Sequence, residues 1–274
     1  MTTRQFVAAV TAVLALAAAT PTAEPVPVRY AEGLVHGFLT LRTLDGTLIA
    51  NGDLIQSARG SRVTSRLVFH FKDGSLFDET AVFSQRGHFR LITDRVIQKG
   101  PAFPRSLEMT IDREAGRVVV RHRDDDGTAK VEDERMDLPD DLANGLVLVL
   151  LKNISPDTPP KSLSMIAATP KPRLVKLAIE SAGRERFSTG TLARNANHYV
   201  VKIEIGGLAG LVAPLVGKQP PDSHAWILGG DAPAFVKFEG PMTLGTPPWR
   251  IELASPVWQA APAKTVDRDD RSNK

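Results

Sequence analysis

The chain has 274 residues, a formal net charge of +3 and no cysteine. The lack of cysteine excludes disulfides, thiolate metal ligands and a lipid-modified N-terminal cysteine, so stability has to come from packing. Acidic and basic residues are interspersed up to the final stretch TVDRDDRSNK. Because no block of basic residues is present, the sequence predicts no nucleic-acid partner.

The first 23 residues have the pattern of a cleaved secretory signal. Arg4 provides a basic start, an apolar run follows from Phe6 to Ala19, and small residues continue to Ala23. Cleavage after Ala19 or after Ala23 fits, although Pro21 disfavours the second. The run is shorter than the roughly 20 residues of a membrane-spanning helix, and no later stretch is longer and equally apolar. We therefore expect a periplasmic or secreted protein with no transmembrane span after cleavage.

Strands are predicted throughout the first half of the mature chain. In SRLVFHFKDGSLFDETAVFSQ, from Ser65 to Gln85, Leu67, Phe69 and Phe71 alternate with residues that point to the other face. Asp73-Gly74 supplies the positive φ angles of a tight hairpin turn. The same alternation, interrupted by turn residues, recurs on both sides of this stretch. This pattern predicts a meander of antiparallel strands.

A change of period marks LPDDLANGLVLVLLKNI in the middle of the chain. Pro139 and the pair Asp140-Asp141 are typical of a helix N-terminus, and Leu142, Leu146, Val149 and Leu150 would share one side of the helix. The alternative is a buried strand over 146–151, because that run is apolar on both faces. Both interpretations make this segment part of the core.

The second half resumes strands after the Pro-rich stretch from Ser155 to Ser162. A turn is expected near Ala182-Gly183. The segment from Gly206 to Trp226 departs from alternation because it is apolar, rich in small residues and broken by prolines. We interpret Leu208 to Val216 as a short helix or lid over the sheet; a buried loop that fills the core is the alternative.

Two stretches carry a resemblance to a known group of proteins. SLEMTIDREAGRVVV, followed by the Pro-Asp-Asp segment, and GDAPAFVKFEGPMTLGTPPWRIEL, from Gly230 to Leu253, resemble exported bacterial proteins of unknown function. The sheet of that group is similar to the half-barrel of lipoprotein carriers. The resemblance implies a curved antiparallel sheet whose apolar concave face holds acyl chains in the carriers. It implies no catalytic residues, and this chain is longer than the carriers in its second half.

These observations predict a mainly β protein with a curved antiparallel meander sheet, half-barrel or barrel-like, one central helix and a short apolar helix or lid. Residues 24–154 would form the N-terminal meander plus helix. Residues 155–258 would add the C-terminal strands of the same β domain, and residues 259–274 a polar disordered tail.

Several groups of polar residues are candidates for chemistry. His70, His88 and His122 lie on predicted strands, but their spacing matches no compact metal motif. Asp222, Ser223 and His224 are adjacent, and neighbours on an extended chain point in different directions, so a triad is not predicted. The acidic stretch RHRDDDGTAKVEDE would place His122 first in a calcium loop, which favours a hairpin instead. Paired carboxylates, such as Glu79 with Glu108 or Asp112, depend on a separation that the sequence does not give.

The function expected from the sequence is therefore binding rather than catalysis. We predict an exported cell-envelope module that binds a lipid or another apolar small molecule on the concave face, with an envelope protein as an alternative partner. No cofactor, metal ligand or catalytic residue is predicted, because no phosphate loop or ligand motif is present. The alternative is an envelope hydrolase whose site assembles only in the fold. The expected ligand-binding residues are Leu67, Phe69, Phe71, Phe77, Phe89, Leu208, Leu211, Val212 and Leu215.

Overall fold

The computed structural model describes residues 24–124, 126–158, 161–189, 191–204 and 220–255. These residues form one sheet of fourteen strands and one helix, α1 (Val147–Asn153). The strands are β1 (Val35–Thr43), β2 (Leu48–Arg59), β3 (Arg62–Phe71), β4 (Leu76–Arg86), β5 (His88–Lys99), β6 (Leu107–Asp112), β7 (Arg117–Arg123), β8 (Ala129–Arg135), β9 (Lys161–Ala167), β10 (Arg173–Thr189), β11 (Leu192–Glu204), β12 (Ser223–Leu228), β13 (Ala234–Pro241) and β14 (Pro248–Leu253).

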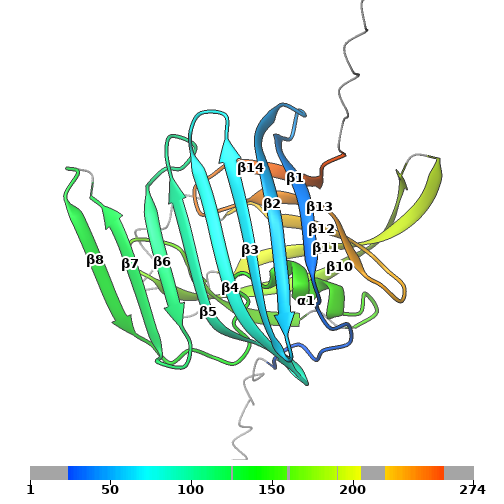
Figure 1. Cartoon of the computed structure of the whole chain (residues 1–274), viewed down its shortest axis with the longest axis horizontal. Helices are drawn as coiled ribbons and strands as arrows, with labels where there is room; N and C mark the ends of the chain where they lie inside the picture. The colour runs from blue at the N-terminus through cyan, green and yellow to red at the C-terminus, as the bar shows by residue number, and fades with distance from the viewer. Residues whose placement is uncertain (1–23, 125, 159–160, 190, 205–219, 256–274) are drawn as a thin grey trace, which may run out of the picture.

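The sheet joins two meanders through a pairing between its first and last strands. Strands β1 to β8 lie side by side in chain order, as do β9 to β14, and β1 pairs with β14. In that pairing Leu41 lies opposite Ile251. The outermost strands of the described sheet, β8 and β9, do not pair with each other. Figure 1 shows the result: β1 to β8 curve in front of β10 to β13, and α1 lies between them. The predicted curved antiparallel meander with one central helix is confirmed.

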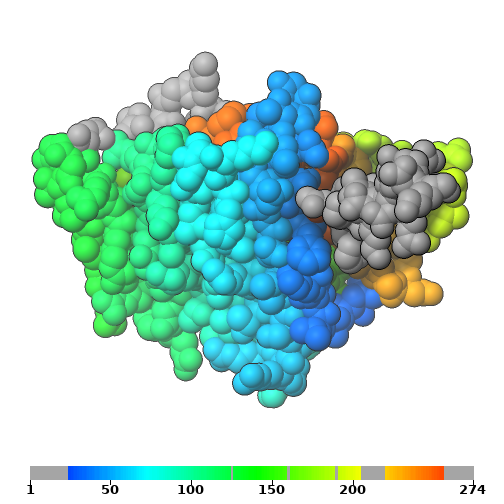
Figure 2. All heavy atoms as spheres, turned by 45° about the horizontal axis from the view of Figure 1, so that its top comes forward, coloured from blue at the N-terminus to red at the C-terminus, as the bar shows by residue number. Residues whose placement is uncertain are grey.

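The core lies inside the curve of the sheet. Leu41 and Phe69 from the front strands, Leu163 and Ile166 from β9, and Leu150 from α1 are buried in the same apolar cluster. Helix α1 therefore fills the concave side, and apolar burial of this kind is the main stabilising contribution to folding. The outer side chains of β1 to β8 form a continuous wall in the space-filling view (Figure 2).

The central helix is shorter than the sequence predicts. Pro139 and Asp140-Asp141 do not open it; α1 begins at Val147, after Gly145 with a φ of 65°. The segment before Gly145 joins β9 instead: Leu142 forms a parallel bridge with Ser164, and the Asn144 side chain bonds both the N–H and the C=O of Ile166. These bonds hold the segment beside β9 and not in the helix. The alternative of a buried strand over 146–151 is also wrong.

The predicted turn at Ala182-Gly183 is wrong as well, because β10 continues through it. Gly183, with a φ of 96°, lies where the register of the β10–β11 pairing shifts between Ser181 and Arg184. A bulge of this kind accommodates an extra residue without ending the strand. Beyond Asn197 and Ala196, which still pair with β12, the strands β10 and β11 pair only with each other, since β9 reaches no further than Ile179. We call residues 184–189 and 191–195 the hairpin arm, which projects at the right of Figure 1.

Three of the segments predicted from the sequence lie outside the described residues: the signal segment 1–23, the lid from Leu208 to Val216 and the tail 259–274. Within the described part of the chain, no helix has the length and apolar character needed to span a membrane.

Candidate functional site

The predicted concave-face residues that the structure describes lie in the packed core. Phe69, Phe71, Phe77 and Phe89 are buried, and Leu67 packs against the same cluster. The Phe71 ring lies 5.4 Å from that of Phe103 and 5.5 Å from that of Trp249, measured between centroids. These side chains pack in the core and do not line either of the two cavities described below. The other four predicted residues, Leu208, Leu211, Val212 and Leu215, fall outside the described residues.

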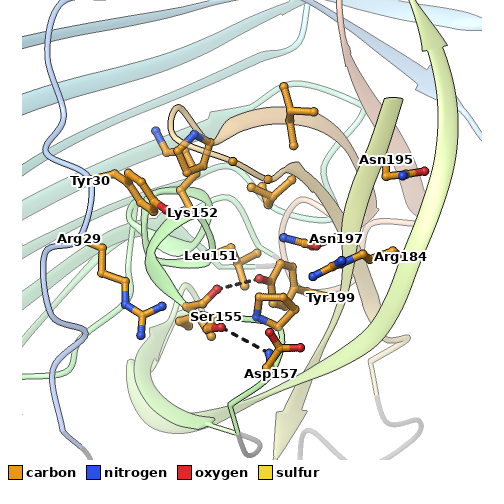
Figure 3. A pocket seen from close by; sticks show the side chains of 17 residues that line it. Arg29, Tyr30, Leu151, Lys152, Ser155, Asp157, Arg184, Asn195, Asn197 and Tyr199 are labelled. Carbon is orange, nitrogen blue, oxygen red and sulfur yellow. Dashed lines mark hydrogen bonds between the residues drawn. The ribbon is translucent and has the colours of Figure 1, made fainter. Parts of the chain in front are cut away.

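A polar cavity of about 350 Å³ lies where the end of α1 meets β10, β11 and β12 (Figure 3). We call it the arm cavity, because Arg184 and Asn195 at the base of the hairpin arm line it. Its other walls come from the segment before β1 with Arg29 and Tyr30, and from the turn after α1 with Ser155. None of these residues was predicted as part of a site.

Asn153 fixes the position of Arg29 in this cavity. The Oδ1 atom of its buried side chain accepts hydrogen bonds from the backbone N–H groups of Arg29 and Tyr30, at 2.9 and 2.8 Å. The same side chain donates to the carbonyl of Val149 at 3.0 Å. Because one side chain bonds both a carbonyl of α1 and two N–H groups of the incoming segment, the N-terminal segment is held against α1.

Tyr199 fixes the opposite wall. Its ring is buried, and its hydroxyl donates to the carbonyl of Ile154 at 2.7 Å, which ties β11 to the chain just beyond α1. Burial raises the pKa of Tyr199 to about 12, and the nearby Asp157 adds to the shift. The phenol therefore remains neutral at physiological pH. It holds the wall in place and does not supply a base.

The positively charged side chains that line the arm cavity differ in whether they form an ion pair. Lys152 is neutralised by Glu32, which is itself held by the amide of Gln56 at 2.7 Å. Arg29 and Arg184 lie on opposite sides of Tyr199 and Ser155 in Figure 3. Neither guanidinium forms an ion pair with the described residues. One exposed carboxylate, Asp157, also lines the cavity. The arm cavity therefore presents to a ligand two guanidinium groups that have no ion pair in the described part of the chain.

Amide groups complete the recognition surface. Asn197 lies opposite Arg184 in the β10–β11 pairing, and Asn195 lies two pairs further along the arm, on the same face. Gly229 permits a close approach here, since a Cβ at that position would lie 3.3 Å from the Asn197 amide nitrogen. Guanidinium and amide groups together bind carboxylate or phosphate oxygens, often through paired hydrogen bonds. The chemistry that this cavity supports is the binding of an anionic, polar group.

A second polar cluster lies on the other face of the same strands. Glu185 accepts from His198 Nδ1 at 2.8 Å and from Trp226 Nε1 at 2.9 Å. His198 Nε2 lies 2.9 Å from His224 Nδ1, and the His198 ring stacks on Trp226 with centroids 4.4 Å apart. Lys237 lies 3.8 Å above the Trp226 ring. We call these five residues the outer-face cluster.

The hydrogen bonds of the outer-face cluster define its tautomers when both imidazoles are neutral. A carboxylate only accepts, so His198 carries its proton on Nδ1 and accepts on Nε2. His224 must then donate from Nδ1, which leaves its Nε2 unprotonated. Burial lowers the pKa of His198, while the Glu185 carboxylate opposes that shift. Neither histidine lines a described cavity.

The remaining candidates from the sequence do not come together as sites. His70 and His88 are exposed whereas His122 is buried, and no group of three His, Cys, Asp or Glu side chains in the described part of the chain could hold a metal ion. Glu108 pairs with Arg95 on the outer face, away from Glu79. His224 bonds His198 rather than its neighbour Ser223.

Glu79 instead lies close to another carboxyl group, that of Asp94 on β5. Asp94 is buried, and its pKa is raised well above the ordinary value, first by burial and then by the Glu79 charge. Burial also raises the pKa of Glu79 to about 7. Both groups face the inside of the sheet, opposite Gly145 in the segment before α1.

Sequence reasoning missed the arm cavity because its residues carry no local signal. Arg29 stands in PVPVRY and Arg184 in SAGRERF, and neither stretch matches a binding motif. The outer-face cluster had one partial signal: alternation places His198 and Val200 on the face opposite Tyr199. The pairing of β11 with β12, which brings His198 opposite Trp226, follows only from the fold.

Comparison with known proteins gives a distant structural similarity. No protein-family model and no curated protein matches the chain. A crystal structure described as a beta-barrel-like protein of domain of unknown function DUF1849 from Brucella abortus is similar to it, with a TM-score of 0.45 and 10% identity. The alignment covers 84% of this chain and 100% of that chain. Similarity at this level is too low to transfer a function.

Proposed function

We propose that the protein is an exported binding module of the cell envelope whose arm cavity holds the anionic group of a small polar ligand. The observation that carries this proposal is the pair of guanidinium groups, Arg29 and Arg184, that face one cavity without an ion pair among the described residues. A carboxylate or phosphate between them would gain charge-assisted hydrogen bonds from both sides.

The states of Tyr199 and Lys152 in the arm cavity favour binding over turnover. Tyr199 is held neutral, and Lys152 is occupied by Glu32. The envelope hydrolase considered from the sequence has its nearest support in the Glu185, His198 and His224 chain. That chain lies on the outer face and not in either described cavity, so we assign it no reaction.

An apolar ligand on the concave face would have a different requirement. Phe69, Phe71 and their neighbours are packed against Phe103 and Trp249, so a lipid would have to separate these rings. Removing such contacts costs a few kcal/mol for each large side chain exposed. The arm cavity needs no such opening, which is why the ligand is placed there.

Anion titration of the purified mature protein tests the proposal. Inorganic phosphate and acetate are titrated at constant ionic strength and followed by amide chemical shifts in NMR spectra. Arg29→Gln and Arg184→Gln should each weaken binding about tenfold, because each removes a charge-assisted hydrogen bond. Arg121→Gln, an equal charge change on β7, is the control and should leave binding unchanged. Equal affinity in all three variants would refute the cavity as the binding site.

Native mass spectrometry of protein purified from its own envelope fraction tests export and ligand together. We expect a measured mass that corresponds to a chain without its first 19 or 23 residues, as the signal pattern predicts. We also expect a small acidic ligand that is released on denaturation. A full-length chain in the cell interior would contradict export, and a retained lipid would favour the concave face instead.

A further inference from the structure

A second cavity adjoins the arm cavity. It has a volume of about 260 Å³ and lies on the side of the turn after α1 where β9 begins. Arg29, Ile154 and Ser155 line both cavities. The Arg29 side chain and the turn after α1 are therefore the boundary between two adjoining spaces, and a ligand that occupies both must pass beside Arg29.

Each of the two cavities has a cation of its own in addition to Arg29. Arg184 lines the arm cavity only, and Lys161, the first residue of β9, lines the second cavity only. No ion pair of Lys161 occurs among the described residues, and its side chain is partly buried. The three positive groups thus lie in the sequence Arg184, Arg29, Lys161 along the two spaces.

Apart from Arg29, the residues shared by the two cavities suit the neutral middle of a ligand. The Ile154 carbonyl already accepts from Tyr199, and the Ser155 hydroxyl accepts from the Asp157 N–H at 3.4 Å. The Ser155 hydroxyl hydrogen remains available as a donor to a ligand oxygen. The one carboxylate, Asp157, lines only the arm cavity, so it repels an anion placed beside it and favours the positions next to the guanidinium groups.

We propose that the two cavities are two subsites for one elongated ligand that carries an anionic group at each end. Arg184 and Arg29 bind one end, Lys161 binds the other, and the turn after α1 contacts the middle. This inference rests on the proposed function of the arm cavity and adds the length and the second charge of the ligand. Lys161 is the residue that determines specificity for length.

A series of ligands tests this inference. Acetate is compared with the dicarboxylates malonate, glutarate and pimelate, and phosphate with the bisphosphate of 1,3-propanediol, whose linker is uncharged, all by NMR titration at constant ionic strength. Joining two groups that bind separate subsites raises affinity only when the linker spans them. We therefore expect at least one longer dianion to bind more than about fivefold tighter than its monoanion. The carboxylate and phosphate arms show which anionic group the subsites prefer.

Variants separate this inference from the proposed function. Lys161→Gln should abolish the gain of the longer dianion and leave acetate and phosphate binding in the arm cavity unchanged, and Lys161→Arg should restore the gain. If Arg184→Gln weakens the monoanions but no dianion binds tighter, or if Lys161→Gln weakens monoanions and dianions equally, the second subsite is refuted and the proposed function stands. If Arg184→Gln has no effect on any probe, the proposed function and this inference both fail.

Discussion

Asp94 is 1% exposed, and neither of its carboxyl oxygens has a hydrogen-bond partner among the described residues. Burial and the nearby Glu79 raise the pKa of Asp94, and burial raises the pKa of Glu79 to about 7. The folded state therefore holds protons that the unfolded chain releases near pH 4. The contribution of the protonated Asp94–Glu79 pair to the unfolding free energy is fully present below the pKa that these carboxyl groups have in the unfolded chain. It is lost as the pH rises through their pKa in the folded protein. The pair makes the protein less stable at neutral to alkaline pH.

We predict that Asp94→Asn removes most of this loss. Wild-type protein should lose on the order of 2 kcal/mol of unfolding free energy between about pH 5 and pH 8, and the variant should lose much less. Denaturant unfolding across this range measures both. Glu79→Gln serves as a second neutralising variant, and Asp78→Asn on the outer face of the same strand is the control. A wild-type curve that is flat or rises with pH would contradict the prediction.

Position 145 requires glycine for two reasons: its φ is 65°, and its Cα lies in close contact with β4 and β5. A Cβ at this position would lie 2.5 Å from the Cβ of Ala81 and 3.1 Å from Asp94 Oδ1. We predict that Gly145→Ala destabilises the fold by about 3 kcal/mol or more, because backbone strain and overlap add. Gly74→Ala is the matched control: its φ is 84° with no atom within 4 Å, so only the strain of about 1 kcal/mol applies. Equal losses in thermal unfolding would mean that the contact is unimportant.

At the scale of elements, strand positions were readable from the sequence wherever a local pattern specified them. The Asp73-Gly74 turn is formed, with Gly74 at a φ of 84°, and Phe69 lies opposite Phe77 across it. The start of α1 was not readable, because Asp140 and Asn144 have partners on distant strands: Asp140 pairs with Arg90, and Asn144 bonds β9. Those bonds override the local helix signal. The arm cavity was unreadable for the same reason, since fold contacts alone bring Arg29 and Arg184 together.

The outer-face cluster attaches the base of the hairpin arm to β11 and β12 through Glu185. Burial lowers the pKa of His198, with a smaller opposing effect from Glu185 and further lowering by His224 and Lys237. The unfolded chain therefore binds the proton more readily than the folded chain. The contribution of neutral His198 to stability is present above the unfolded pKa of about 6.5 and is lost as the pH falls through the folded pKa.

We predict that acidification disrupts this cluster, because protonated His198 becomes a donor at Nε2 and can no longer accept from His224. Trp226 stacks on His198, so its fluorescence should change with a midpoint below the ordinary histidine value. Glu185→Gln should move the midpoint to still lower pH, since it removes the carboxylate that favours the charged ring. Trp226→Phe assigns the signal. A midpoint unaffected by Glu185→Gln, or a transition that survives Trp226→Phe, would overturn this account.

At the scale of the whole molecule, the pairing of β1 with β14 decides whether the two meanders are independent. Leu41, fully buried on β1, lies opposite Ile251 on β14, and both belong to the core that contains α1. The first meander cannot bury its inner face without α1 and the second meander. Because the sheet and the core are continuous across this pairing, the two halves should unfold together.

We predict one cooperative transition for the mature chain. Far-UV circular dichroism reports all strands. In a Trp258→Phe background, tryptophan fluorescence reports β12 and β14, which hold Trp226 and Trp249. The two denaturation curves should coincide. Ile251→Ala should shift both curves together, by about 2 to 4 kcal/mol, because the cavity it leaves lies in the shared core. Exposed Leu253→Ala at the end of β14 is the control and should have little effect. If Ile251→Ala moved the fluorescence curve alone, the two meanders would be separate folding units.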